Sequence, residues 1–353
     1  MTLIGMLHHR KDPRTVIKAY AYAAIARAEG AELVYFSPGQ VNLEDKTVNG
    51  YIYENGDWVQ TVVRWPDVIY NTGSPEKLSK QYDIIRVMKQ SIPFTTHSIG
   101  NKMRVYKRIE EAGKFSQYLI PSQVVRHLKS FFDQLNMYQK IVFKPVNGRK
   151  GQGILLIERS QDRYVVQNQD KREYISTAGL RELIGAKLRE GAHMVQPYIH
   201  CKTKAGNAYD FRLHVQKDGN GEWVITTTYP RIAPAGSIIA NINNGGATNY
   251  LEPFLLQEFG ERYYDIKRYL EQFSLMMARH LDQIQMEKFN ERIDELGMDV
   301  ALDEFGKLWI FEINWRPGCP PAFYLELDVV KNLIRYCIYL ANQAKEIREQ
   351  IRQ

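Results

Sequence analysis

The feature that most constrains this chain is a lysine at the end of a strand-like run, followed directly by a loop rich in glycine. The run is Ile141-Val-Phe-Lys144, and the loop after Pro145 carries Gly148, Gly151 and Gly153. Glycines let backbone N–H groups approach phosphate oxygens, and a lysine at the strand end can neutralise their charge. The stretch is not a Walker A loop, because no Gly-Lys-Ser/Thr closes it and a strand follows it. Taken alone, it is more typical of a hairpin with a solvent-exposed lysine.

A second group of polar residues lies on two strand-like runs near the end of the chain. The run that contains Asp299 is followed by a turn at 303–307 and by a run that carries Glu312 and Asn314. Alternate residues of a strand share a face, and a paired strand can place Asp299 beside Glu312 and Asn314. Three oxygen donors on one face suit Mg²⁺. The alternative is a solvent-facing side of a hairpin, but the apolar neighbours indicate a buried strand, where unpaired carboxylates are costly.

The order of the expected elements divides the chain into three parts, residues 1–95, 96–199 and 200–353. The first part begins with a strand, a helix that ends at Gly30 and a second strand. A hairpin with an Asn55-Gly56 turn follows. This order predicts an N-terminal α/β domain.

The other two parts are expected to be α+β lobes. The central part predicts a single sheet with helices on one side, and the last part combines a long helix, the two polar strands and a C-terminal helix. The expected helices are 101–113, 176–190, 259–284 and 327–352, and the expected strands are 141–144, 153–158, 163–167, 194–199, 209–215, 223–229, 298–302 and 308–313.

Charge and composition limit the partners of the chain. A formal charge of +7 suits an anionic ligand, but Lys and Arg are spread along the chain, so nucleic acid is not the expected partner. No apolar run approaches the roughly 20 residues that span a bilayer, and the first residues predict a strand and not a signal peptide. We therefore expect a soluble, cytoplasmic protein without a membrane partner. Cys201, Cys319 and Cys337 lack metal-site spacing and are expected to be reduced thiols.

Together these motifs resemble the ATP-grasp superfamily, over nearly the whole stretch from Asn101 to Gly318. More narrowly, the chain resembles the YheC/YheD family. The motifs that carry this second resemblance are the opening βαβ, Tyr-Asn-Thr at 70–72, Lys144-Pro with its glycine loop, Tyr209-Asp-Phe-Arg212, Asn244-Gly-Gly-Ala-Thr-Asn249 and Glu312-Ile-Asn-Trp-Arg-Pro-Gly318. The resemblance implies an ATP-grasp fold preceded by an α/β domain. The family is described as endospore-coat associated, which implies a sporulating bacterium and an association with the spore coat.

The resemblance also implies a role for each matching residue. The implied residues are Lys102, Lys144, Gly148, Gly151, Gly153, Gln196, Tyr198 and Ile199 for ATP; Asp299, Glu312 and Asn314 for Mg²⁺; and Arg212 and Arg316 for the phosphoryl group and a carboxylate. Many family members carry Glu where this chain has Gln196, but a Gln can still hydrogen-bond the adenine amino group. For either arginine alone, a surface ion pair is an equal alternative.

The resemblance implies an Mg·ATP-dependent enzyme that joins an unidentified carboxylate to an amine through an acyl phosphate. Cations aimed at the transferring phosphoryl group lower the barrier of such a reaction without a protein nucleophile. Two alternatives remain open. One is a phosphotransferase of the same fold that acts on a hydroxyl, and the other is a spore-coat structural protein that binds ATP without turnover. The presence of every expected metal ligand argues against the second.

Overall fold

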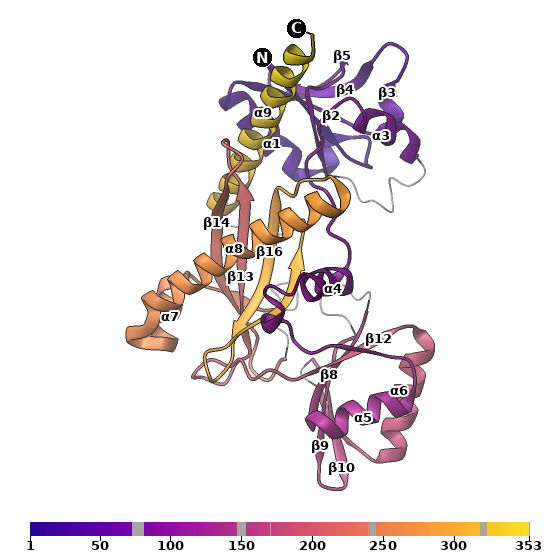
Figure 1. Cartoon of the computed structure of the whole chain (residues 1–353), viewed down its shortest axis with the longest axis vertical. Helices are drawn as coiled ribbons and strands as arrows, with labels where there is room; N and C mark the ends of the chain where they lie inside the picture. The colour runs from indigo at the N-terminus through magenta and orange to yellow at the C-terminus, as the bar shows by residue number, and fades with distance from the viewer. Residues whose placement is uncertain are drawn as a thin grey trace.

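The structure of the protein is a computed structural model that describes residues 1–72, 81–146, 153–169, 171–238, 240, 245–317 and 323–352. The strands of these residues form three sheets. Figure 1 shows the first sheet at one end of the molecule, the second at the other end and the third between them. The predicted nucleotide residues Gly148 and Gly151 lie outside the described residues, as do Asn244, Gly318 and Cys319.

The first sheet confirms the predicted βαβ start. Strand β1 lies between β2 and β6 and is parallel to both, and α1 connects β1 to β2. The turn between β4 and β5 has positive φ at Asn55 (49°) and Gly56 (88°), as a type I′ turn requires. The elements of this part are β1 (Thr2–Leu7), α1 (Ile17–Ala28), β2 (Ala31–Phe36), β3 (Val41–Asn42), β4 (Thr47–Glu54), β5 (Asp57–Arg64), β6 (Val68–Asn71) and α3 (Tyr82–Lys89).

The second sheet is antiparallel throughout, in the order β11-β10-β9-β8-β12-β7. Phe131 and Leu135 of α5 share one hydrophobic core with Leu180 and Ile184 of α6 and with Phe143 of β8, so both helices cover the same face, as predicted. The sequence pattern predicted neither α5 nor β11. The elements are β7 (Gln123–Val125), α5 (Leu128–Tyr138), β8 (Lys140–Pro145), β9 (Leu155–Ser160), β10 (Arg163–Asn168), β11 (Lys171–Ile175), α6 (Thr177–Glu190) and β12 (His193–Pro197).

The third sheet has the order β15-β14-β13-β16-β17 and packs one face on the long helix α8. Phe211 and Leu213 of β13 are fully buried in the same core as Leu270 and Met277 of α8. The predicted helix at 259–284 is confirmed as α8, which begins only at Tyr263 because the chain turns at Gly260, whose φ is 59°. Helix α7, which ends at Phe259, was not predicted. The elements are β13 (Tyr209–Lys217), β14 (Trp223–Ile232), β15 (Ala247–Thr248), α7 (Leu251–Phe259), α8 (Tyr263–Phe289), β16 (Glu295–Leu302) and β17 (Leu308–Asn314).

Two helices pack against a sheet that belongs to a different part of the predicted division than their own. Helix α4 (Lys102–Ala112) packs Val105 and Ile109 into the core of the third sheet. Helix α9 (Phe323–Arg352) places Leu333 and Ile334 in a core of the first sheet. The division at 95 and 199 therefore remains a proposal about chain order. Among the described residues, no helix combines the length and the apolar character of a membrane span.

Candidate active site

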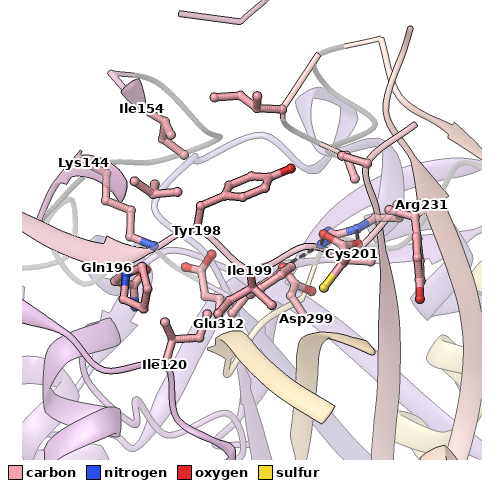
Figure 2. Close-up of a pocket in the computed structure, with 18 of the residues that line it drawn as sticks. Ile120, Lys144, Ile154, Gln196, Tyr198, Ile199, Cys201, Arg231, Asp299 and Glu312 are labelled. Atoms are coloured by element: carbon pink, nitrogen blue, oxygen red, sulfur yellow. Dashed lines mark hydrogen bonds and ion pairs between the residues drawn. The ribbon is translucent and has the colours of Figure 1, made fainter. Parts of the chain in front are cut away.

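A cavity of about 200 Å³ lies between the second and third sheets, and we call it the central cavity. Figure 2 shows its lining, with Lys144, Gln196 and Tyr198 on one side and Asp299 and Arg231 on the other. It brings together seven of the residues that the sequence singles out: Lys102, Lys144, Gln196, Tyr198, Ile199, Asp299 and Glu312. These residues come from β8, β12, α4, β16 and β17 and from the segment directly after β12.

Two lysines from different elements meet in this cavity. Lys144 is near the end of β8, and Lys102 begins α4, whose first turn is capped by the side chain of Asn101. Burial, followed by the adjacent Lys102, holds the pKa of Lys144 well below its ordinary value, while Glu312 acts in the opposite direction. Two neighbouring cations repel each other unless an anion lies between them. The pair is therefore suited to a phosphate group.

Gln196 is held in one orientation by its neighbours. Gln196 on β12 is only 2% exposed, and its Nε2 donates to Oγ of Ser122 at 2.6 Å. The amide also hydrogen-bonds Tyr106 of α4, whose hydroxyl donates to the carbonyl of Ile310 at 2.5 Å. With its nitrogen engaged, the amide presents its oxygen as an acceptor. Such an acceptor suits the amino group of adenine.

Tyr198 and Ile199 extend the wall of the cavity beyond Gln196. The backbone N–H of Tyr198 donates to the carbonyl of Lys140 at 3.0 Å. The Lys140 ammonium lies 4.8 Å from the centre of the Tyr198 ring. Figure 2 shows this ring across the cavity from Glu312. An aromatic and aliphatic wall of this kind can hold a flat base by stacking and apolar contact.

The described end of the glycine loop is a turn at Gly153. This residue has a φ of 72°, a conformation that favours glycine, and a Cβ atom there would lie 3.1 Å from Cγ of Pro145. Gly153 does not itself line the central cavity as the described residues define it, whereas the next residue, Ile154, does. The contact of this loop with phosphate remains a prediction.

The third sheet presents a row of charged side chains to the other side of the cavity. Arg212 on β13 is directly across from Asp299 on β16, and Asp299 is directly across from Glu312 on β17. Asp210, two residues before Arg212, is across from Arg231 on β14. Because side chains alternate along a strand, Asp210 and Arg212 share the face opposite the one that packs on α8. The pairing register of the strands is therefore sufficient to place these charged side chains next to one another.

Four of these side chains pair with one another, and we call them the buried charge network: Asp210, Arg212, Arg231 and Asp299. Nε of Arg212 donates to Oδ1 of Asp299 at 2.6 Å. Arg231 donates to both carboxylate oxygens of Asp210, at 2.6 and 2.7 Å, and its Nη2 lies 2.9 Å from Oδ2 of Asp299. Burial alone would raise the pKa of Asp299, but the two arginines hold it below its ordinary value. Asp299 therefore stays ionised.

The donor set fits a magnesium ion only if the nucleotide contributes. Among the described residues, no group of three or more His, Cys, Asp or Glu side chains is arranged to hold a metal. Asp299 and Glu312 supply carboxylates on facing strand positions, and Asn314, two residues along, faces Gly297. Mg²⁺ commonly binds one or two carboxylates plus phosphate oxygens and water. Asp299 is already engaged by two arginines, so binding a metal would have to change at least one of those contacts.

The two predicted catalytic arginines do not line the central cavity as the described residues define it. Arg212 is connected to it through Asp299. The Arg316 guanidinium lies 4.2 Å from the centre of the Trp315 ring. Burial lowers the pKa of Arg316, and the nearby Tyr70 and Glu295 oppose that effect. Because Tyr70 belongs to β6, Arg316 faces the junction between the first and third sheets.

The sequence pattern does not single out Arg231, Ser122 or Tyr106. The strand that carries Arg231 was expected to end at 229, whereas β14 continues through Pro230 to Ile232. Ser122 and Tyr106 act on Gln196 from positions distant in the sequence, so no local pattern could identify them.

The fold and the central cavity define the class of this protein. Two α+β lobes enclose a cavity with lysines on one side and carboxylate-bearing strands on the other, which is the ATP-grasp architecture. The model of the YheC/D-like ATP-grasp family matches residues 91–340, and the chain belongs to this family.

Two curated relatives from Bacillus subtilis (strain 168) are similar over most of the chain. The endospore coat-associated protein YheD is 25% identical over 331 residues, which cover 89% of this chain and 72% of YheD. The endospore coat-associated protein YheC is 21% identical over 335 residues, which cover 90% of each chain.

Two solved structures share the fold. D-alanyl-alanine synthetase A from Vibrio cholerae has a TM-score of 0.57 at 11% identity, covering 97% of this chain and 98% of that one. A Chryseobacterium gregarium RiPP-associated ATP-grasp ligase, in complex with ADP and a leader and core peptide, has a TM-score of 0.53 at 13% identity. That comparison covers 96% of this chain and 97% of the ligase.

Proposed function

We propose that this protein is an Mg·ATP-dependent carboxylate–amine ligase that acts through an acyl phosphate. The observation that carries the proposal is the meeting of Lys102 and Lys144 with Asp299 and Glu312 around one cavity. Burial and the adjacent Lys102 disfavour the charged form of Lys144, which Glu312 offsets only in part, and Asp299 and Glu312 line the same cavity from the third sheet. A polyphosphate with a divalent cation would complement both groups.

Each side of the central cavity would bind a different part of the nucleotide. The oxygen of Gln196 would accept from the adenine amino group, and Tyr198 and Ile199 would contact the base. Lys102 and Lys144 would neutralise phosphate charge. Mg²⁺ held by Asp299, Glu312 and Asn314 would supply further neutralisation of the phosphates.

The reaction would proceed in two displacements. A substrate carboxylate oxygen attacks the γ-phosphorus of ATP, so that a C–O–P linkage forms while the bond to the β-phosphate oxygen breaks and ADP leaves. The amine nitrogen then attacks the acyl carbon, so that a C–N bond forms while the C–O bond to the phosphate breaks. Phosphate leaves with the carboxylate oxygen, and the proton lost from the nitrogen ends on the leaving phosphate. The first displacement needs no protein base, because a carboxylate is already ionised. Arg316, which faces the first sheet, would orient the carboxylate, and Arg212 would hold Asp299.

The relatives suggest the class of substrate and its setting. The names of YheD and YheC favour an association with the endospore coat. The RiPP-associated ligase is described with a leader and core peptide, which favours a polypeptide as the carboxylate or amine substrate here. Residues 1–95 would form the pre-ATP-grasp domain, and 96–199 and 200–353 would contribute the two lobes of the grasp.

An ADP-release screen against amino acids, short peptides and coat-derived acids would identify a substrate. With that substrate labelled with ¹⁸O in its carboxylate, the acyl-phosphate route must transfer label into the released phosphate. Unlabelled phosphate, or a stable phosphorylated alcohol as product, would favour the phosphotransferase alternative. Tight Mg·ATP binding with no ADP release from any compound would favour a structural role.

A further inference from the structure

A second cavity of about 520 Å³ lies on the third-sheet lobe, next to the central cavity. We call it the aromatic groove and define it by Lys202, Tyr209, Phe259, Arg262, Tyr269 and Glu304. Figure 1 shows its elements, the α7–α8 junction and the β16–β17 hairpin, at the end of the third sheet that lies nearer the second sheet. Its volume is within the range of about 300–1,000 Å³ that is usual for ligand sites.

The floor of the aromatic groove is apolar and its rim is charged. Tyr209 is buried in the floor, where its hydroxyl donates to the carbonyl of Leu302 at 3.1 Å. Lys202 and Arg262 bring positive charge to the rim, and Asp265 and Glu304 bring negative charge. In the part of the chain that the structure describes, none of these four side chains forms an ion pair, and all four are exposed. Both signs of charge are therefore available to a ligand.

An exposed phenylalanine extends this surface beyond the groove. Phe305, at the tip of the β16–β17 hairpin, is 87% exposed. Its turn is firmly fixed, because Oδ1 of Asp303 accepts from the backbone N–H groups of Phe305 and Lys307 at 3.0 and 2.9 Å. Nε1 of Trp309 donates to Oδ2 of the same aspartate at 2.8 Å. The exposed ring of Phe305 thus lies on a fixed backbone turn, next in the chain to Glu304 of the groove.

The aromatic groove adjoins the central cavity. Tyr209 lines both of them. Lys202 lines the groove together with a smaller space that Tyr198 shares with the central cavity. A molecule bound in the groove would therefore be next to the place where we propose that ATP reacts.

We propose that the aromatic groove binds a polypeptide segment that carries an aromatic or aliphatic side chain between charged side chains of opposite sign. The apolar residue lies on Tyr209, Phe259 and Tyr269, an acidic residue pairs with Lys202 or Arg262, and a basic residue pairs with Asp265 or Glu304. Contacts that extend from the groove to Phe305 suit a chain better than a single small molecule. The two carboxylates on the rim, Asp265 and Glu304, disfavour nucleic acid because they would repel phosphates. That this polypeptide is the ligase substrate rests on the proposed function, whereas its binding does not.

The test uses the full-length protein and fluorescein-labelled peptides in which Glu, Tyr and Lys occur in every order between glycines. Fluorescence anisotropy reports binding without nucleotide. At least one order is expected to bind saturably, and to bind more weakly as salt is added. Arg262→Glu and Phe305→Ser are each expected to weaken that binding by about threefold to tenfold, through rim-charge reversal and loss of apolar contact. Lys129→Glu is the control, because it makes the same kind of charge change on exposed α5.

The variants keep the two proposals separable. Phe305 is almost fully exposed, so its replacement by Ser leaves folding intact, and Mg·ATP binding by both groove variants should equal that of the unaltered protein. If no peptide binds, or if all variants bind equally, the groove proposal is overturned. Equal competition by free amino acids would show a small-molecule site, and a concentration-dependent dimer lost in Arg262→Glu would show a second copy of the chain. Peptide binding without any ATP binding would overturn only the proposed function.

Discussion

The two sides of the central cavity differ in how their charges are satisfied before any ligand is present. On the third sheet, the buried charge network pairs two arginines with two aspartates through hydrogen bonds of 2.6 to 3.3 Å. On the other side, Lys144 and Lys102 face each other as like charges, and burial with this repulsion lowers the pKa of Lys144. The charges of the network are therefore already paired with one another, whereas the electrostatic energy of the two lysines becomes favourable only when an anion binds between them.

The two sides of the central cavity should therefore contribute differently to folding stability and to nucleotide affinity. A satisfied network of buried charges fixes the strands that carry Asp299 and Glu312, and removing one member leaves its partners uncompensated. An unsatisfied cation pair contributes little to folding but gains strongly when phosphate binds. Folding stability should therefore depend on the network, and nucleotide affinity should depend on the lysines.

The largest effect is expected from Asp299→Asn. This change leaves Arg212 and Arg231 buried around a neutral amide, which should lower the free energy of unfolding by about 3 to 5 kcal/mol. Urea unfolding followed by circular dichroism measures the change. Lys144→Ala is the matched comparison, and its unfolding free energy should be equal to or greater than that of the unaltered protein. Similar losses in both variants would remove the distinction between the two sides.

The next effect concerns turnover. Glu312→Gln keeps the shape of the side chain but weakens a carboxylate ligand, and we expect ADP release to fall by about 10² to 10³. Nucleotide affinity should change much less, because the lysines and the adenine wall remain. Initial rates and calorimetric titration on the same preparation measure the two quantities. Unchanged turnover would remove Glu312 from the proposed metal site.

A smaller effect is expected on nucleotide affinity. Lys144→Ala removes a charged partner of phosphate, worth about 1.5 to 3 kcal/mol, so Mg·ATP should bind about 10-fold to 100-fold more weakly. Calorimetric titration measures this. Lys187→Ala is a suitable control, because Lys187 lies on α6 of the same lobe, pairs with Glu190 and does not line the central cavity as the described residues define it. Equal weakening by both changes would show that general positive charge, and not the position of Lys144, matters.

The smallest effect is a proton taken up on binding. The pKa of Lys144 is lowered in the free protein, and a bound phosphate should raise it towards 10.5. Between those two values, binding requires protonation, so nucleotide affinity should fall as pH rises through that window. Titrations in buffers of different ionisation enthalpy measure the uptake, and Lys144→Ala should abolish it. Proton release on binding would contradict the assignment.

Many of the helices, strands and turns could be predicted from the sequence, because they depend on residues that are close together in the chain. The Asn55-Gly56 turn follows from the backbone conformation that these two residues prefer. Helix α5 and helix α7 were not predicted from the pattern. The helix expected at 259–284 is α8, and its separation from α7 depends on the positive φ of Gly260, which the residue permits but does not require.

Only part of the candidate site could be predicted from the sequence. Strand alternation identified Glu312 as a neighbour of Asp299, and the register of β16 and β17 places them opposite each other. Arg231 was missed because its strand was expected to end at 229, whereas β14 continues to Ile232 and places Arg231 across from Asp210. The position of Arg316 beside the first sheet depends on the packing of separate parts of the chain.

Calorimetric titration of the unaltered protein with Mg·ATP tests the central claim most directly. If the central cavity is a nucleotide site, the titration must show saturable heat for one site per chain, and the melting temperature must rise with nucleotide concentration. The same titration with Lys144→Ala should show weaker binding. Neither heat nor a thermal shift at millimolar Mg·ATP, from protein that unfolds cooperatively, would contradict the account.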